Sequence, residues 1–402
     1  MNNHSNRYFI GGILALIISM GIGRFAYTVI LPYMQAELAF SNATAGFLAT
    51  SNYVGYFLGA LLASKRNSQY RKVNLLRLGL IISIVTTAMI GIFSSYPLWF
   101  ITRFISGIAS AYVFVVASSI VLDRLAFNNR SHLSGLFYSG VGLGILLSSL
   151  VVSKLDQWFH WEGTWVGLAL LSCGLFIFIW FFIREEEQEK LLVKHNVHQQ
   201  DMPTFPRHMI LLLIIAYGLE GLGYIVTGTF IVSIAENSTH FHGDAATVWL
   251  IVGIAASPSC IIWSYFGKKI GFIKSLIFAM LLQAIGIGLP VFGENTSLIF
   301  ISAFLFGATF MGITTLATTL ARQLAPTNSN HILGFLTASY ALGQLLGPAL
   351  AGILATFTNS FLYALLAAAI IVIIGASLLL IGIKYEKMGG NQHAICKHQN
   401  YK

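Results

Sequence analysis

Charged residues and cysteines are scarce in this chain. Only 9% of its 402 residues are charged, whereas soluble domains carry about 25%. A set of soluble domains would need polar surfaces that this composition does not supply. The three cysteines, Cys173, Cys260 and Cys396, offer no disulfide framework. The composition therefore excludes a soluble multidomain protein and points to a membrane protein.

The motifs of common enzymes are absent as well. The sequence has no GxxxxGK[ST] loop to hold the phosphates of ATP, and no HExxH, CxxC or GxSxG. His195 and His198 are spaced as two metal ligands on a helix are, but no further ligands accompany them. We therefore expect neither an enzyme nor a cofactor or metal site.

Long apolar runs are what the chain does have. Hydrophobic residues make up 56% of it, and they gather in about twelve runs near the ~20 residues that a spanning helix needs. We expect an all-α integral membrane protein with twelve transmembrane helices. Their expected spans are 8–36, 43–64, 73–94, 97–122, 133–155, 162–183, 207–236, 244–267, 272–293, 297–321, 331–356 and 359–384.

Lysine and arginine predict the orientation. Of the 23 Lys and Arg residues, all but Lys154, Arg24 and Arg103 fall at the termini or beside the connections after helices 2, 4, 6, 8 and 10. Cytoplasmic loops carry such an excess, so both termini are expected in the cytoplasm. This placement explains the net charge of +9 without nucleic acid as a partner. The outer helix ends then hold several tryptophans, as the membrane interface favours: Trp99, Trp158, Trp161, Trp165 and Trp249.

The chain also repeats itself. GIGRFAYTVILPYM, from Gly21 to Met34, has a second copy in GLGYIVTGTFIVSI, from Gly221 to Ile234. Parallel repeats in one class of secondary transporters form two halves around a binding site near the midplane. We expect six-helix halves at residues 1–183 and 207–384, joined by a cytoplasmic linker at 184–206 and followed by a cytoplasmic tail at 385–402.

These motifs resemble the major facilitator superfamily over essentially the whole chain. Helix 4 reads RFISGIASAYVF from Arg103, similar to the superfamily's arginine followed by small residues, here Gly107 and Ala111. Helices 5 and 11 read SGVGLGILLSS and GQLLGPALAG, similar to its glycine-rich helix, with a proline only in the second. GIGRFAYTVILPYMQ and SNYVGYFLGALLAS resemble the YbfB/YjiJ branch of bacterial inner-membrane proteins. The resemblance implies a multi-pass transporter of the bacterial inner membrane.

One feature departs from the superfamily pattern. Its cytoplasmic loops 2–3 and 8–9 usually carry an aspartate followed by basic residues, which form part of an inner gate. Here those loops read ASKRNSQYRK and FGKKIGFIK, without an acid. Asp123, at the inner end of helix 4, is expected to pair with Lys65 or Arg66 instead.

Three charges are expected deep in the bilayer: Arg24 in helix 1, Arg103 in helix 4 and Glu220 in helix 7. Charges in spans are costly, so they face a protein interior or a wet cavity. In a structural interpretation, Arg24 pairs with Glu220, or Arg103 bonds helix carbonyls, as packing devices. In a functional one, the arginines bind an anionic group and Glu220 carries a proton, because burial favours the neutral acid and a nearby arginine favours the carboxylate.

Other residues near these charges are further candidates. Substrate contacts are expected from Tyr27, Asn52, Tyr53, Tyr224, Thr227 and Gln344, although each also fits a hydrogen bond between helices. Helix packing or gating is expected from Gly107, Gly140, Gly144, Gly343, Gly347 and Pro348, together with Asp123.

The sequence therefore predicts a secondary active transporter that moves a small organic solute by alternating access, with protons as the coupling ion. Two deep arginines against one glutamate favour an anionic or zwitterionic cargo. One alternative is a drug/proton antiporter, in which Glu220 meets lipophilic cations among aromatic rings. Another is a non-transporting receptor or scaffold. The expected partners are the solute, the coupling ion and the lipid bilayer, with the chain acting as a monomer.

Overall fold

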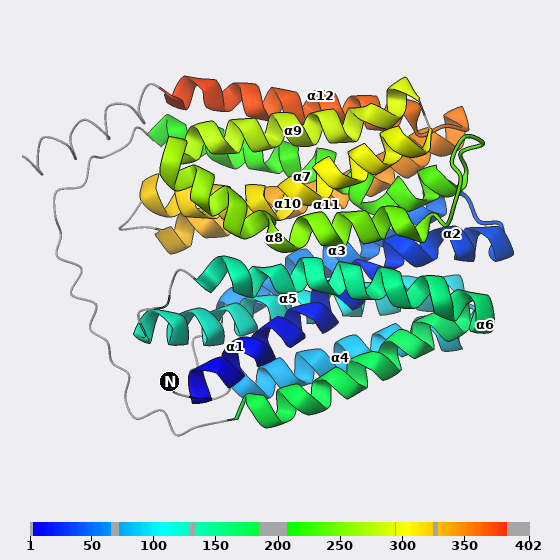
Figure 1. Ribbon diagram of the computed structural model, residues 1–402, viewed down its shortest axis with the longest axis horizontal. Helices are drawn as coiled ribbons and strands as arrows, with labels where there is room; N and C mark the ends of the chain where they lie inside the picture. The colour runs from blue at the N-terminus through cyan, green and yellow to red at the C-terminus, as the bar shows by residue number, and fades with distance from the viewer. Residues whose placement is uncertain are drawn as a thin grey trace, which may run out of the picture.

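The computed structural model describes residues 3–65, 72–128, 130, 133–184, 207–293, 295–324 and 329–383, and its regular structure is entirely helical (Figure 1). The helices are α1 (Asn3–Leu16), the π-helical segment η1 (Ile17–Ile22), α2 (Ala26–Leu38), α3 (Asn42–Lys65), α4 (Lys72–Ile92), α5 (Tyr96–Phe127), α6 (Ser134–Phe182), α7 (Arg207–Glu236), α8 (Ala246–Ile270), α9 (Phe272–Phe292), α10 (Thr296–Leu324), α11 (Ser329–Thr358), α12 (Leu362–Leu378) and the 3-10 segment η4 (Leu379–Gly382). Most of the expected linker, with His195 and His198, and the expected tail lie outside the described residues.

Within the described chain, eleven helices are long and apolar enough to cross a membrane. They match the expected spans, except that expected helices 5 and 6 form one element, α6. Its 49 residues would extend ~73 Å if straight, against a hydrocarbon core of about 30 Å. However, the backbone leaves the helical region at His160 (φ 52°, ψ −176°), and Leu155 lies against Gly167 across this break. The element therefore doubles back on itself.

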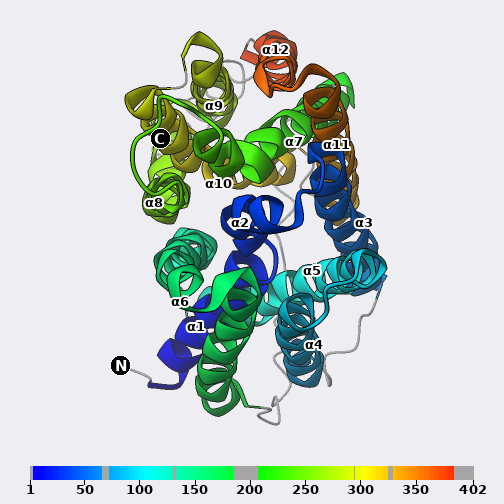
Figure 2. The same cartoon turned by 90° about the vertical axis from the view of Figure 1, so that its right-hand side faces the viewer.

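The helices gather in two groups. Helices α1, α4, α5 and α6 lie in the lower part of Figure 1, and α7 to α12 lie in the upper part. Between the groups, α6 packs on α8, α3 on α11 and α2 on α7 (Figure 2). Thr28 on α2 donates a hydrogen bond to the Gly228 carbonyl on α7 (2.6 Å), so the two copies of the sequence repeat meet.

The first span is interrupted around Arg24, where the sequence predicts one continuous helix. Residues 23–25 separate η1 from α2, and the Gly23 amide bonds to the carbonyl of Ile18, five residues back (2.8 Å). Gly21 sits directly against the backbone of Gly144 on α6, so the two helices touch where they lack side chains. Such π-type turns are frequent at functional sites. The break places Arg24 in an irregular turn rather than on a regular helix face.

The expected interfacial role of the tryptophans is wrong for four of the five. Trp158 is 78% exposed, but Trp99, Trp161, Trp165 and Trp249 are buried inside the bundle. Trp99 and Trp161 pack edge to face with ring centres 5.5 Å apart, and the Trp99 indole donates to the Phe93 carbonyl (2.6 Å). These rings fill space between helices, which their position near helix ends does not reveal.

Glycines let the helices approach closely at the expected positions. A Cβ on Gly144 would lie 2.7 Å from the Gly21 Cα, and one on Gly140 would lie 2.9 Å from the Ile13 carbonyl. The equivalent contacts in the other group join α11 to α7, where a Cβ on Gly343 would lie 2.9 Å from the carbonyl carbon of Gly221.

Three more of these positions pack in the same way. A Cβ on Gly347 would lie 2.7 Å from the Leu222 carbonyl, and one on Gly107 would lie 2.8 Å from the Tyr56 amide. The carbonyl of Pro348 lies against Gly46 on α3. All six residues are thus found at helix contacts.

Replacing Gly144 with valine should destabilise the protein, because the new side chain meets backbone that cannot rotate away. Overpacking of this kind typically costs ~1–3 kcal/mol. Thermal unfolding in detergent and the monodisperse fraction on size-exclusion chromatography would measure the loss. Gly174→Val in the second limb of α6 is the control, because nothing lies within 4 Å of its Cβ position. Equal losses in the two variants would contradict the packing role of Gly144.

Candidate functional site

Arg24 lies in a cage of aromatic rings. Its guanidinium carbon is 4.1 Å from the ring centre of Tyr56, 4.8 Å from that of Tyr53 and 5.2 Å from that of Phe25. The residue is only 3% exposed. Cation–π contacts replace part of the lost hydration, but Nε and Nη2 have no hydrogen-bond partner among the described residues. The aromatic cage therefore holds the guanidinium, and two of its donor nitrogens remain without an acceptor in the described part of the chain.

Arg103 lies nearby on α5. Its guanidinium carbon is 4.4 Å from the ring centre of Tyr27, and it interacts electrostatically with Arg24 and Tyr53. Arg103 is 1% exposed, and its Nε and Nη1 also lack a partner in the described part of the chain. Tyr27 faces Arg103 and donates its hydroxyl to the Ala45 carbonyl (2.9 Å).

Hydrogen bonds hold α5 against the break in the first span. The Asn52 amide donates to the carbonyl of Arg103 (2.9 Å), and the Ser106 hydroxyl donates to the carbonyl of Gly23 (3.0 Å). Asn52 thus joins α3 to α5, while its own carbonyl oxygen has no partner among the described residues. This geometry makes Asn52 a support for the two arginines.

No carboxylate neutralises either arginine in the described structure. The ion pairs found there join Lys72 to Asp123 (3.3 Å) and His160 to Glu37 (3.2 Å). The structural interpretation in which Arg24 pairs with Glu220 is therefore not seen. Asp123 pairs with Lys72 among the described residues. Its expected pairing with Lys65 or Arg66 stays a prediction, because the side chains of those two residues lie outside the described residues.

Glu220 occupies a separate buried place on α7. It is 0% exposed, and neither carboxyl oxygen makes a well-formed hydrogen bond within the described chain. The amide of Gln283 on α9 is the polar group that interacts with it. Gln283 is itself fully buried, and its amide lacks any other partner among the described residues. A buried acid next to one adjustable amide can hold or release a proton without breaking a network.

Stacked rings stand close to Glu220. Tyr217 and Tyr340 stack with ring centres 4.3 Å apart, and Tyr340 stacks on Tyr224 at 5.4 Å. All three tyrosines interact electrostatically with Glu220, and Tyr224 and Tyr340 also with Arg24. Tyr224 and Tyr340 therefore lie near both the acid and the arginine cage.

Tyr224, at one end of the stack, makes further side-chain contacts. Tyr224 lies parallel to Phe310 at 6.1 Å, and its hydroxyl accepts a hydrogen bond from the Gln344 amide. Thr227, one turn further along α7, is buried with its hydroxyl unpartnered in the described part of the chain. The expected substrate contacts thus fall in three places. Tyr53 lies at Arg24, and Tyr27 and Asn52 lie at Arg103. Tyr224 belongs to the stack and is bonded to Gln344.

Four residues that the sequence reading missed belong to this site. Tyr56 is the closest ring to Arg24, Gln283 faces Glu220, and Tyr217 and Tyr340 form the stack. Two signals were available: Gln283 is an amide in the middle of an apolar span, and Tyr217 lies one helical turn before Glu220. Tyr340 and Tyr56 could not be placed without knowing which helices pack together.

A second polar cluster closes the end of the bundle where α2 and α7 end, which we call the distal end (right in Figure 1). Asp244, just before α8, accepts hydrogen bonds from the Ser153 hydroxyl of α6, the Tyr33 hydroxyl of α2 (3.3 Å) and the Ala246 amide (2.8 Å). The Ser149 hydroxyl of α6 donates to the carbonyl of Ala246 (2.5 Å). Asp244 therefore ties the second group of helices to the first.

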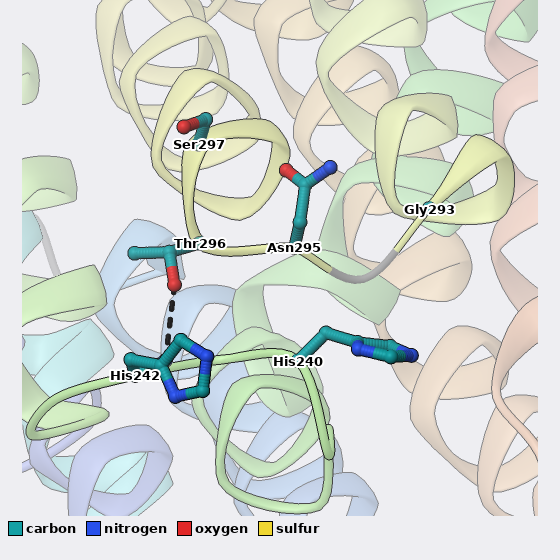
Figure 3. Close-up of a pocket in the computed structure, with 6 residues that line it drawn as sticks. All are labelled: His240, His242, Gly293, Asn295, Thr296 and Ser297. Atoms are coloured by element: carbon teal, nitrogen blue, oxygen red, sulfur yellow. Dashed lines mark hydrogen bonds between the residues drawn. The ribbon is translucent and has the colours of Figure 1, made fainter.

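A surface pocket of about 520 Å³ lies between the loop after α7 and the start of α10 (Figure 3). Its lining includes the exposed side chains of His240 and His242, and the His242 amide donates to the Thr296 hydroxyl (3.0 Å). Two imidazoles do not complete a metal site, and the described residues contain no group of three or more His, Cys, Asp and Glu that could hold a metal ion. This pocket is separate from the buried arginines.

A family model described as "Uncharacterised MFS-type transporter YbfB" matches residues 16–380. The chain therefore belongs to this family of the major facilitator superfamily, and the predicted family is confirmed. Transporters of this superfamily are multi-pass membrane proteins, which agrees with the eleven apolar helices found in the described residues.

Individual relatives are similar over most of their length. The uncharacterized MFS-type transporter YceJ of Bacillus subtilis is 23% identical over 360 residues, which cover 86% of this chain and 89% of YceJ. The sialic acid transporter NanX of Escherichia coli is 23% identical over 364 residues, which cover 88% of this chain and 87% of NanX. The crystal structure of the nucleoside transporter NupG superposes with a TM-score of 0.72 at 16% identity, over 95% of this chain and all of that one. The last likeness is one of fold.

Changing Tyr224 to phenylalanine should destabilise the protein modestly, because the buried amide of Gln344 loses its acceptor. Hydrogen bonds between membrane helices contribute about 0.6 kcal/mol on average and up to ~1.7. Unfolding in mixed detergent micelles would measure the difference in free energy. Tyr363→Phe on α12 is the control, because Tyr363 is 57% exposed. A loss no larger than that of the control would show that the contact is not stabilising.

Proposed function

We propose that this protein is a secondary active transporter that moves a small anionic or zwitterionic organic solute across the bacterial inner membrane by alternating access, coupled to protons. The single observation that carries the proposal is that Arg24, Arg103 and Glu220 are all buried and that no ion pair joins them within the described chain. Uncompensated charge in a membrane interior is costly. A protein that retains it is expected to use it on a passing ion.

The proposed architecture is twelve spans in two six-helix halves. The two limbs of α6 supply the fifth and sixth spans, because the helix reverses at His160. The hydrogen bond from Thr28 to Gly228 joins equivalent positions of the repeat, as expected where two related halves meet at a common axis. The distribution of lysine and arginine then puts both termini, the linker and the tail in the cytoplasm.

The charge of the site favours an anionic group on the cargo. The ring faces of Tyr53 and Tyr56, which would attract a lipophilic cation, are already occupied by the guanidinium of Arg24. The rings of Tyr217, Tyr340 and Tyr224 beside Glu220 are stacked on one another. The site therefore offers positive charge to a ligand, which argues against the drug/proton antiporter. The relative NanX is named a sialic acid transporter, which agrees with an acidic cargo.

Glu220 is the proposed proton carrier. Its buried carboxyl lies apart from the arginines, yet both interact with Tyr224 and Tyr340. A cargo anion at the arginines changes the field at these rings and therefore the cost of charging Glu220. This coupling through a shared stack needs no direct contact between the cargo and the acid.

Replacing Glu220 with glutamine should abolish proton-driven accumulation and spare counterflow exchange, because glutamine fills the same space without a titratable proton. Everted membrane vesicles with a pH-sensitive dye would report proton movement when organic acids, sugars, amino acids or cationic dyes are added. The matched control is Glu236→Gln, an exposed acid at the end of the same helix. Proton movement that persists in Glu220→Gln would remove this residue from the mechanism.

Asp244 is proposed to hold the distal, periplasmic end closed. In Asp244→Ala the bonds from Tyr33 and Ser153 are lost, so cysteine at buried position 149 should react severalfold faster with a membrane-impermeant maleimide, in a background without native cysteines. Asp156→Ala is the control, because Asp156 lies in the same acidic region without a described hydrogen bond to the other group. A cysteine at exposed position 157 measures full reactivity. Unchanged labelling of position 149 in Asp244→Ala would exclude the closing role.

A further inference from the structure

The two buried arginines differ in which nitrogens are left open. Arg24 lacks hydrogen-bond partners at Nε and Nη2, whereas Arg103 lacks them at Nε and Nη1, among the described residues. The Nε and Nη2 hydrogens of a guanidinium point in the same direction and form one edge of its plane. Nε and Nη1 do not share such an edge. Arg24 can thus offer two parallel donors to one ligand group, and Arg103 offers single donors.

Parallel donors match a particular ligand chemistry. A guanidinium edge binds the two oxygens of a carboxylate through two parallel, charge-assisted hydrogen bonds. Both Arg24 donor atoms are shielded from solvent, since the residue is 3% exposed. The guanidinium lies over the aromatic rings of Tyr53 and Tyr56, and its Nε and Nη2 have no hydrogen-bond partner among the described residues. The cage therefore holds the plane in place and spends none of these donors.

We propose that Arg24 is the carboxylate anchor of the transport site, binding one carboxylate of the cargo through its Nε–Nη2 edge, and that Arg103 assists by charge alone. This inference rests on the proposed function and narrows it, because it names carboxylic acids as the cargo class. Arg103 lies close enough to repel Arg24, so an anion between them lowers the energy of both. The irregular turn at residues 23–25 takes Arg24 out of the regular helix, and its guanidinium lies against the rings of Tyr53 and Tyr56 on α3.

Geometry and charge can be separated with conservative variants. Lysine keeps the charge of arginine but presents a point charge without a planar fork. Arg24→Lys should therefore weaken carboxylate binding by about tenfold or more, since one charge-assisted hydrogen bond is lost. Arg103→Lys should retain binding within about threefold, because the positive charge by which Arg103 assists persists. Arg322→Lys, at an exposed position on α10, is the control for a change with no effect.

The test measures ligand binding to the purified full-length protein in detergent, not transport. The probes are three acids, formate, pyruvate and benzoate, each beside its neutral amide at equal ionic strength. The shift of the thermal unfolding midpoint with concentration gives the apparent affinity of wild type and the three variants. We expect at least one acid, and none of the amides, to raise the unfolding midpoint of the wild type. This rise should be lost in Arg24→Lys and kept in Arg103→Lys.

Three results would overturn the inference. These are equal stabilisation by acids and amides, no stabilisation of wild type by any acid, and a loss in Arg103→Lys that equals or exceeds the loss in Arg24→Lys. If Arg24→Lys does not fold, Arg24→Gln replaces it, provided that this variant elutes normally on size-exclusion chromatography. The inference then requires that the acids do not stabilise Arg24→Gln. Because proton movement in vesicles is measured separately, failure here would leave the coupling role of Glu220 standing, and failure of the vesicle experiment would leave carboxylate binding standing.

Discussion

Everything in this structure depends on the cost of placing charge in an apolar interior. Apart from charges near their ends, the spans are built almost entirely from uncharged residues, and the three charges expected deep in the bilayer, Arg24, Arg103 and Glu220, are buried. Moving a charged side chain into a membrane costs several kcal/mol or more, and the described structure compensates it only with aromatic rings and one amide. Tyr224 and Tyr340 interact with both Glu220 and Arg24, and no ion pair joins the acid to either arginine within the described residues. In the proposed transporter, the arginines therefore remain available to the anionic cargo and Glu220 to the proton.

The packing of small residues makes that arrangement geometrically possible. Gly21 meets Gly144 backbone to backbone, which draws the first span onto α6 and accompanies the π-type turn that ends at Arg24. Ser106 then fastens α5 to the same turn, and Asn52 ties α3 to α5 at Arg103, so that Arg103 comes beside Arg24. The binding groups are thus positioned by hydrogen bonds to backbone carbonyls, which do not depend on the side chains of the arginines themselves.

Much of the architecture could be predicted from the sequence, because long apolar runs, basic loops and small-residue spacings are local signals. The family, the approximate spans and the burial of the three charges were available in this way. The turn between the fifth and sixth spans was available too, because the expected spans 133–155 and 162–183 leave a gap that contains His160, where the backbone leaves the helical region. Gln283, Tyr56 and Tyr340 were missed because their roles depend on which helices pack together. The contact between Tyr27 and Arg103 was missed as well, because it depends on how α5 packs against the first span.

The most direct test of the central claim is an experimental structure determined with bromoacetate bound, whose bromine can be located by anomalous scattering. The account predicts the carboxylate at the Nε–Nη2 edge of Arg24, on the side that faces Arg103, with Glu220 remaining beside Gln283. A side chain of Glu220 paired directly with Arg24, and bromine absent from that region, would contradict it. That result would make the buried charges a packing device.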